Sequence, residues 1–303
     1  MKPPPFAYCA PETLEEALER LAEHGSEAKP LAGGQSLVPM LNFRLARPAV
    51  LVDLNRIPEL SYIRRSPPAV SEGRAGPVVP AGIEIGAMTR QREAERSGLV
   101  ASAAPLLPEA LAHVAHPAIR NRGTVGGSVA HADPAAELPA LMLALRASLH
   151  LRSREAERWV DAAEFFLAPF LTAQEAGELL VGLEIPARAA GTGVAFDEVA
   201  RRRGDYALVG VAAVVALDSN GRCRDVRLAY VNAGPTPLPA PGAAAVLEGE
   251  PPGSEAFRAV AEEAARETDP PSDLHASADY RRQLIRVLTA RVLSRACERA
   301  AVP

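Results

Sequence analysis

The strongest constraint on the fold of this chain comes from two turns with adjacent glycines, at 33–34 and at 126–127. Adjacent glycines let the backbone approach a ligand closely and expose consecutive N–H groups, which is what a diphosphate needs. Polar side chains flank both turns: Gln35 and Ser36 follow the first, and Thr124 and Ser128 surround the second. Two such turns could hold one diphosphate from both sides, whereas either turn alone is also typical of an ordinary tight turn.

Other phosphate-binding patterns are missing from the sequence. Neither glycine turn fits G-x-G-x-x-G, so the Rossmann fingerprint is excluded. Lysine occurs only at positions 2 and 29, and neither lysine follows a phosphate-loop glycine pattern. A Walker-A site and a mid-chain Schiff-base lysine are therefore excluded as well.

Length and composition indicate a two-domain protein. The chain has 303 residues, of which 48% are hydrophobic and 23% are charged, enough for one large and one smaller domain. A net charge of -4 and 4% aromatic residues argue against nucleic-acid binding. No apolar run reaches the roughly 18 to 20 residues of a membrane-spanning helix. The segment 1–5 lacks the apolar core of a signal peptide, so we expect no membrane insertion and a cytoplasmic location.

The three cysteines, Cys9, Cys223 and Cys297, are far apart in the sequence and form no C-x-x-C pair. Their spacing predicts neither a disulfide framework nor an iron–sulfur or zinc site. Any iron–sulfur cluster that works with this chain would therefore be held by another chain.

The first part of the chain alternates helical and extended patterns. Thr13 is a predicted helix cap, with a helix stop at Gly25, and strands are expected at 29–32 and 50–54 around the first glycine turn. The second glycine turn leads into a helix that starts near Pro134. We expect this domain to end near residue 177.

Beyond residue 177 the pattern changes to long strands, which predict an antiparallel sheet. Asn-Gly at 220–221, between two apolar runs, indicates a hairpin. A Pro/Gly-rich connector is expected at 234–253, followed by helices at 254–267 and 279–301. The last helix carries arginines that indicate either a solvated face or a subunit interface: Arg282, Arg286, Arg291, Arg295 and Arg299.

Longer motifs around the glycine turns resemble one known family. The segment LAGGQSLVPML at 31–41, with LVDL at 51–54, resembles the first FAD motif of carbon monoxide dehydrogenase medium subunits. The segments IRNRGTVGGS at 119–128 and AHADPAAELP at 130–139 resemble the second. The resemblance continues in RRRGDYALV at 201–209 and HASADYRR at 275–282, so it covers essentially the whole chain. The wider family is the FAD-binding subunits of xanthine dehydrogenase-like molybdenum hydroxylases.

The resemblance implies an α+β fold with two domains. The first, at 1–177, would be a vanillyl-alcohol-oxidase-type (PCMH-type) FAD-binding domain of two α/β subdomains. The second, at 178–303, would be a C-terminal domain of antiparallel sheet plus helices, like that of the carbon monoxide dehydrogenase flavoprotein.

The resemblance also implies the site residues. The FAD diphosphate would be held by the two glycine motifs, at Ala32, Gly33, Gly34, Gln35 and Ser36, and at Thr124, Gly126, Gly127 and Ser128. Glu137 matches an acidic residue that contacts FAD, commonly Asp. Leu180 matches a residue that lies against the flavin, and Tyr206 matches a position where an aromatic ring covers the isoalloxazine. The alternatives for these last two are an ordinary core leucine and a strand-edge tyrosine.

The histidines allow two further interpretations. A metal site could use His113, His116, His131 and Asp133, because imidazole and carboxylate suit zinc or iron. Only the first two of these residues are close in sequence, and FAD explains their loop better. A covalent histidyl link to FAD occurs elsewhere in this fold, but the family implied here usually binds FAD noncovalently. We therefore expect noncovalent FAD, no metal and no catalytic side chain.

The implied function is electron transfer within a molybdenum hydroxylase complex. FAD would receive electrons from [2Fe-2S] clusters in a small subunit and pass them to an external acceptor, while a large molybdopterin subunit oxidises the substrate. A dimer of heterotrimers is the expected assembly. The alternatives are a free-standing flavin oxidoreductase of the same fold and a nonenzymatic nucleotide-binding module. Nothing in this chain identifies the substrate or the acceptor.

Overall fold

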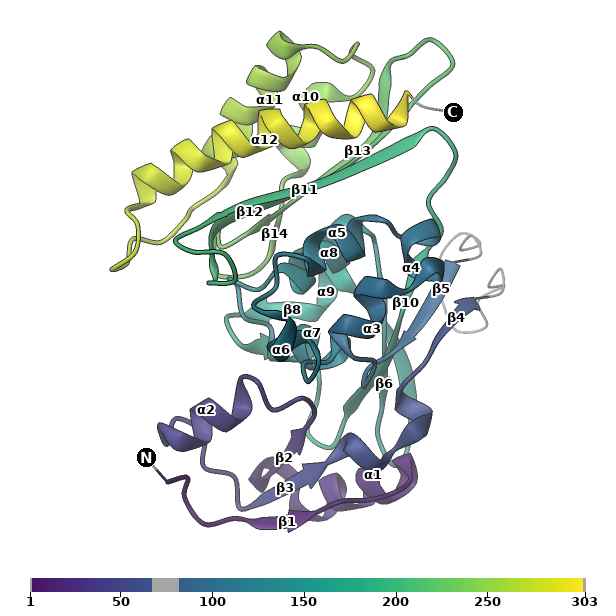
Figure 1. Ribbon diagram of the computed structural model, residues 1–303, viewed down its shortest axis with the longest axis vertical. Helices are drawn as coiled ribbons and strands as arrows, with labels where there is room; N and C mark the ends of the chain where they lie inside the picture. The colour runs from purple at the N-terminus through teal and green to yellow at the C-terminus, as the bar shows by residue number, and fades with distance from the viewer. Residues whose placement is uncertain (1, 67–81, 302–303) are drawn as a thin grey trace.

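A computed structural model describes residues 2–66 and 82–301. Figure 1 shows three units stacked along the longest axis of the molecule. The unit that contains the N-terminus is a small sheet with α1, the middle unit is a larger sheet covered by short helices, and the unit at the far end is an antiparallel sheet covered by α12. The α+β fold class predicted above is confirmed.

The first unit is a three-stranded parallel sheet of order β1-β3-β2, formed by Ala7–Cys9, Val50–Asp53 and Ala28–Leu31. Helix α1, Leu14–His24, begins as expected, because the Thr13 hydroxyl accepts a hydrogen bond from the Glu16 amide at 3.2 Å. Its apolar face is buried, and it ends at Gly25, where φ is +51°. Helix α2, Leu37–Asn42, follows the first glycine turn.

The middle unit is a five-stranded antiparallel sheet of order β4-β5-β10-β6-β7. Its strands are Ile63–Ser66, Gly82–Gly86, Leu179–Pro186, Ser148–Arg152 and Glu157–Asp161. The helices of this unit are α3 Gln91–Arg96, α4 Gly98–Ala103, α5 Leu106–Leu111, α6 Pro117–Arg120, α7 Val125–His131, α8 Glu137–Ala144 and α9 Ala162–Phe165. A small hairpin joins β8, Phe166–Ala168, to β9, Leu171–Thr172. Short 3-10 helices lie at Gly25–Glu27, Leu54–Arg56 and Pro58–Leu60.

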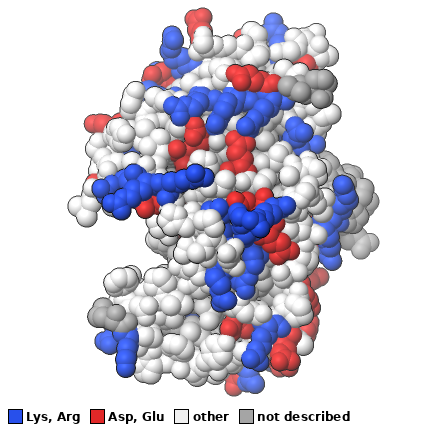
Figure 2. Space-filling model, viewed as in Figure 1, with Lys and Arg blue, Asp and Glu red and all other residues white. Residues whose placement is uncertain are grey.

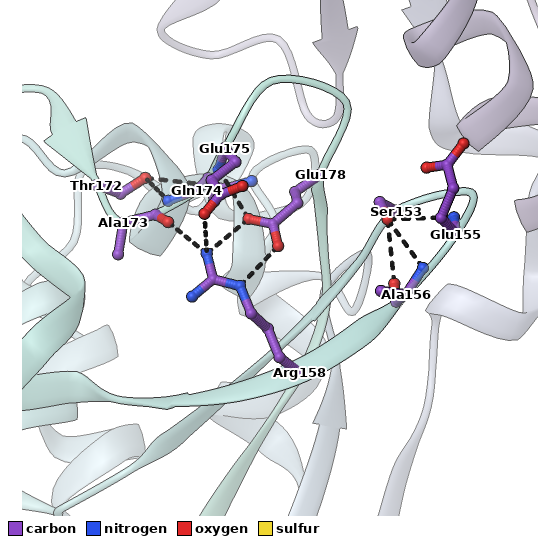
Figure 3. A network of polar contacts seen from close by, with 9 residues as sticks. All are labelled: Ser153, Glu155, Ala156, Arg158, Thr172, Ala173, Gln174, Glu175 and Glu178. Carbon is purple, nitrogen blue, oxygen red and sulfur yellow. Dashed lines mark hydrogen bonds and ion pairs between the residues drawn. The ribbon is translucent and has the colours of Figure 1, made fainter.

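Strand β10 differs from the sequence-based expectation, which placed 178–185 in the second domain. It lies at the centre of the middle sheet, between β5 and β6. Figure 3 shows how the segment before it is anchored: the guanidinium of Arg158, on β7, donates to both carboxylate oxygens of Glu178, at 2.7 and 2.8 Å, and to the carbonyl of Ala173 at 2.7 Å. Strand β10 is hydrogen-bonded on both edges by strands of the middle sheet, β5 and β6, and therefore belongs to that sheet. This favours a domain boundary after β10 over one at 177/178.

The third unit is a four-stranded antiparallel sheet of order β11-β12-β13-β14. Its strands are Thr192–Ala200, Ala207–Leu217, Cys223–Val231 and Leu238–Pro239. Helices α10, α11 and α12, at Pro241–Leu247, Ser254–Glu267 and Ala278–Ala300, cover one face of it. The two terminal helices match the prediction, whereas the segment expected as a connector holds α10 and β14.

The predicted hairpin at 220–221 joins β12 to β13. Of the two turn residues only Gly221 has a positive φ, +72°, whereas a two-residue type I′ turn requires a positive φ at both, so the hairpin turn is of another type. Instead the carboxylate of Asp218 accepts the amides of Asn220 and Arg222, at 2.8 and 2.9 Å, and this widens the turn.

The arginines of α12 contact their own chain. Arg299 binds the carboxylate of Glu109 and the carbonyl of Val194, each at 2.6 Å, and Arg291 pairs with Asp197 at 3.0 Å. The other three have intrachain partners as well: Arg282 with Asp269, Arg286 with Glu262, and Arg295 with the carbonyl of Phe196. Figure 2 shows basic and acidic side chains side by side over the region of α12. These contacts fasten α12 onto β11 and α5.

Two cysteines that are distant in sequence meet in the core of the third unit. The sulfurs of Cys223, on β13, and Cys297, on α12, lie 3.9 Å apart, and both residues are buried as free thiols. Burial raises the pKa of Cys297 to about 12, so this thiol stays protonated and packs as a small apolar group. Sequence spacing did not reveal this pair because only sheet–helix packing brings it together.

Candidate functional site

The first glycine turn forms one wall of a pocket of about 460 Å³. Gly34 adopts a φ of +72°, a conformation that glycine reaches without strain. Among the described residues, the backbone amides of 33–36 have no hydrogen-bond acceptor, so they are available to an anion. The pocket is lined by Leu31, Ala32, Gly33, Gly34, Gln35, Val38, Pro39, Asp53, Asn55, Ile119 and Arg122.

The two glycine turns lie against each other. A β-carbon on Gly33 would collide with the backbone of Arg122 and Gly123, so the loop before the second turn packs directly on the first. A β-carbon on Gly127 would lie 3.3 Å from the β-carbon of Ala32. The tertiary structure therefore brings together two motifs that the sequence keeps far apart, as one diphosphate site requires.

The second turn differs from the first in its hydrogen bonds. It lies inside α7, whose cap is the Thr124 hydroxyl, which accepts the Gly127 amide at 3.0 Å. The amides of Val125 and Gly126 donate to the carbonyls of Thr89 and Ala87, each at 2.9 Å. Our expectation that both turns offer consecutive free N–H groups is wrong for this turn. Its glycines serve close packing, since a β-carbon on Gly126 would collide with Ala87.

Tyr206 reaches this site from the third unit. It is the last residue of the loop between β11 and β12, and the residue is 61% exposed. Partial desolvation of its phenol and the charges of Asp133 and Glu137 raise the pKa of Tyr206, while a hydrogen bond with Ser36 lowers it. The predicted aromatic residue therefore lies beside the first glycine turn and near the acidic residues of the second motif.

Glu137 lies at the start of α8 and is only 6% exposed. Burial raises the pKa of Glu137 to about 8, and the nearby carboxylates of Glu198 and Asp133 act in the same direction. Glu198 comes from β11 and lies 3.5 Å from Nδ1 of His113. A pKa of about 8 keeps most of this carboxyl protonated at pH 7, so it can donate a hydrogen bond.

Leu180 lies on β10 and is 3% exposed, within the main hydrophobic core. Its strand is irregular at this point, because the register with β6 shifts between Leu180 and Gly182. The burial of this side chain favours the alternative of an ordinary core leucine.

A polar network that was not predicted joins the two glycine motifs along the wall of the pocket. Arg90 donates to the carbonyl of Arg122 and to the side-chain oxygen of Asn55, each at 2.6 Å. Asn55 in turn donates to the carbonyl of Ala32 at 2.9 Å. Asp53 accepts the hydroxyl of Tyr8 at 2.6 Å and the Asn55 amide at 2.9 Å. The sequence signal for this network was the presence of two polar residues, Asp53 and Asn55, directly after the apolar stretch 50–52.

The histidines considered for a metal site do not converge. In the described part of the chain, no group of three or more His, Cys, Asp or Glu side chains could hold a metal ion. His131 instead packs against the ring of Phe170, with centroids 5.1 Å apart, and His113 packs against Phe196 at 5.3 Å. Within the same described ranges, no helix is both long and apolar enough to cross a membrane.

Family comparisons define the class of protein to which this fold and site belong. Residues 4–188 match the FAD-binding domain in molybdopterin dehydrogenase, and residues 194–296 match the C-terminal domain of CO dehydrogenase flavoprotein. The chain belongs to this family of FAD-binding oxidoreductase subunits. Its cofactor is FAD, and the pocket fits it, because unpaired amides face a space that can take a diphosphate.

Individual relatives match over nearly the full length of the chain. It is 42% identical to the alpha subunit of the 6-hydroxypseudooxynicotine dehydrogenase complex of Paenarthrobacter nicotinovorans, over 99% of this chain and 97% of the relative. It is 39% identical to the carbon monoxide dehydrogenase medium chain of Hydrogenophaga pseudoflava, over 99% and 100%. The chain is therefore a medium-type FAD-binding subunit of the molybdenum hydroxylase class.

Solved structures agree with these relatives. The carbon monoxide dehydrogenase of Hydrogenophaga pseudoflava superposes with a TM-score of 0.92 at 40% identity, covering 99% of this chain and 100% of that one. Quinoline 2-oxidoreductase of Pseudomonas putida 86 superposes with a TM-score of 0.90, also at 40% identity, and covers 99% of each chain.

Proposed function

We propose that this chain transfers electrons within a molybdenum hydroxylase complex, from [2Fe-2S] clusters in a small partner subunit to an external acceptor. The observation that carries the proposal is the pocket between the first glycine turn and the loop 119–122 that precedes the second, in a chain that matches subunits of dehydrogenase complexes over 97% to 100% of their length. Bound FAD supplies the redox chemistry, since it accepts electrons singly and in pairs.

The residues of this chain would bind and orient the cofactor. The unpaired amides of 33–36 would hold the diphosphate, and the second turn would support them through the contact between Gly127 and Ala32. Glu137, a buried neutral acid, would donate a hydrogen bond, and Tyr206 would cover the exposed side of the flavin. No side chain is assigned a role as general acid or base.

Substrate choice is proposed to belong to the large molybdopterin subunit. Relatives at similar identity, 36% to 42%, are named for different substrates: 6-hydroxypseudooxynicotine, carbon monoxide, glyceraldehyde, caffeine and nicotine. Each value compares a relative with this chain, and the similar values for different named substrates are what we expect of a subunit that does not contact the substrate. We further propose a dimer of heterotrimers located in the cytoplasm.

Purification of the chain together with the products of its neighbouring genes tests this proposal. We expect FAD, iron, sulfide and molybdenum in one complex, with flavin absorbance that bleaches when the iron–sulfur clusters are reduced. Clusters that are reduced while the flavin stays oxidised would contradict the electron-transfer role.

The alternative, a free-standing flavin oxidoreductase, predicts a different result. Such a protein would run alone on gel filtration, retain FAD and turn over a substrate without partner subunits. A colourless chain that does not take up added FAD would contradict both functions.

A further inference from the structure

Arg122 stands out among the residues that line the pocket. It is exposed, it lies in the loop that packs against the first glycine turn, and its backbone is held at both ends. Its amide donates to the carbonyl of Ile119 at 3.0 Å, and its carbonyl accepts the guanidinium of Arg90 at 2.6 Å. The backbone of Arg122 is therefore held in place beside the unpaired amides of 33–36.

The guanidinium of Arg122 has no partner of its own. Among the described residues it makes no hydrogen bond and no ion pair. Its charge nevertheless acts inside the pocket. Burial alone would raise the pKa of Asp53, but hydrogen bonds from Tyr8 and Asn55, together with the charge of Arg122, lower it. The side chain of Arg122 thus lies within electrostatic range of Asp53, which also lines the pocket.

The other charged residue that lines the pocket, Asp53, and the neighbouring Arg90 are already engaged. Both carboxylate oxygens of Asp53 accept hydrogen bonds, from Tyr8 and from Asn55. Arg90 donates to Asn55 and to the Arg122 carbonyl. Arg122 is therefore the uncommitted cation at this pocket, within the part of the chain that the structure describes. A guanidinium matches phosphate geometry with two parallel N–H donors.

We propose that Arg122 binds the diphosphate of the cofactor together with the amides of 33–36 and so determines most of the ionic part of the affinity. This inference rests on the proposed binding of FAD between the glycine turns. It assigns to Arg122 a role that the backbone turns cannot fill, since neutral amides carry no net charge to balance a diphosphate.

Titration of the purified, FAD-stripped complex with three ligands tests the inference. FAD and ADP contain a diphosphate, whereas riboflavin contains none. We expect Arg122→Ala to weaken FAD and ADP by the same factor, about 10- to 100-fold for the loss of hydrogen bonds to a charged group. Riboflavin affinity should not change. Arg122→Lys keeps the positive charge but lacks the two parallel N–H donors of a guanidinium. Its affinity for FAD and ADP should therefore lie between those of the unmodified protein and Arg122→Ala.

Arg154→Ala is a matched control, because Arg154 is exposed and lies in the turn between β6 and β7, in another part of the fold. It should bind all three ligands like the unmodified protein, and thermal melting verifies that each variant is folded. Binding of FAD by Arg122→Ala within twofold of the unmodified protein would overturn the inference while leaving the proposed function intact. An unmodified complex that binds no FAD would instead overturn the proposed function.

Discussion

The carbonyl oxygen of Arg122 occupies the space in which a β-carbon on Gly33 would lie. This contact joins the loop of the second glycine motif to the turn of the first, and both partners are backbone, which cannot move aside as a flexible side chain can. The absence of a side chain at Gly33 is therefore a condition for the two motifs to meet. The geometry of the pocket depends on this single close approach.

Gly33→Ala should separate the two turns. The added methyl group would force the backbone of Arg122 away, and such overpacking costs about 1–3 kcal/mol. We expect a lower melting temperature and a clear loss of FAD, measured by flavin absorbance per mole of protein. Gly98→Ala is the control, because a β-carbon there meets open space. Equal FAD content in the two variants would contradict the role assigned to the contact.

Thr124→Ala should weaken the helix that carries the second turn. The Thr124 hydroxyl caps α7 by accepting the Gly127 amide, and loss of such a cap costs about 1 kcal/mol. Denaturant unfolding and FAD titration should both show the loss. Thr124→Ser keeps the hydroxyl and should behave like the unmodified protein. A serine variant as impaired as the alanine variant would show that the methyl group matters, not the cap.

Glu137→Gln should stabilise the cofactor-free protein in a pH-dependent way. Burial raises the pKa of Glu137 in the folded state to about 8, whereas an unfolded Glu has a pKa of about 4.3. The folded state therefore holds a proton that the unfolded state releases, so rising pH destabilises the unmodified protein between these two values. The Gln variant carries no such charge. Its advantage in melting temperature should be near zero at pH 4 and largest at pH 8; a constant difference would be inconsistent with this titration.

Arg281→Met should be more damaging than the same change at the next residue. The side chain of Arg281 is 1% exposed and pairs with Asp273 at 2.7 Å, and it also donates to the carbonyl of Leu208. The Asp273 side chain is 42% exposed and stays solvated without its partner, so the main loss is the buried hydrogen bond to the Leu208 carbonyl, which costs about 1–3 kcal/mol. Arg282 makes only longer, exposed contacts with Asp269 and Asp279, at 3.3 Å, so Arg282→Met should cost under about 1 kcal/mol. Denaturant unfolding of both variants compares the two costs, and equal values would refute the distinction.

Local sequence patterns predicted the elements whose stability is local. The Thr13 cap and the apolar face of α1, and the limits of α11 and α12, follow from interactions within a few residues. The long motifs at 31–41 and 119–139 likewise indicated FAD and the family, because cofactor-binding segments are continuous in the chain. The sheet to which β10 belongs was not predictable in this way, because the residues of an apolar strand do not indicate which other strands it pairs with.

The sequence by itself determined the two glycine turns, the α+β alternation and the kind of cofactor. The tertiary structure alone decided that Gly33 packs on the Arg122 backbone, that the amides of the second turn are already bonded, and that Glu137 is held neutral by burial beside Glu198. The physical reason is that hydrogen-bond partners, close packing and desolvation are set by groups distant in sequence. The sequence gives the type of each residue, but its protonation state and its unpaired hydrogen-bond donors depend on the groups that pack against it in the folded protein.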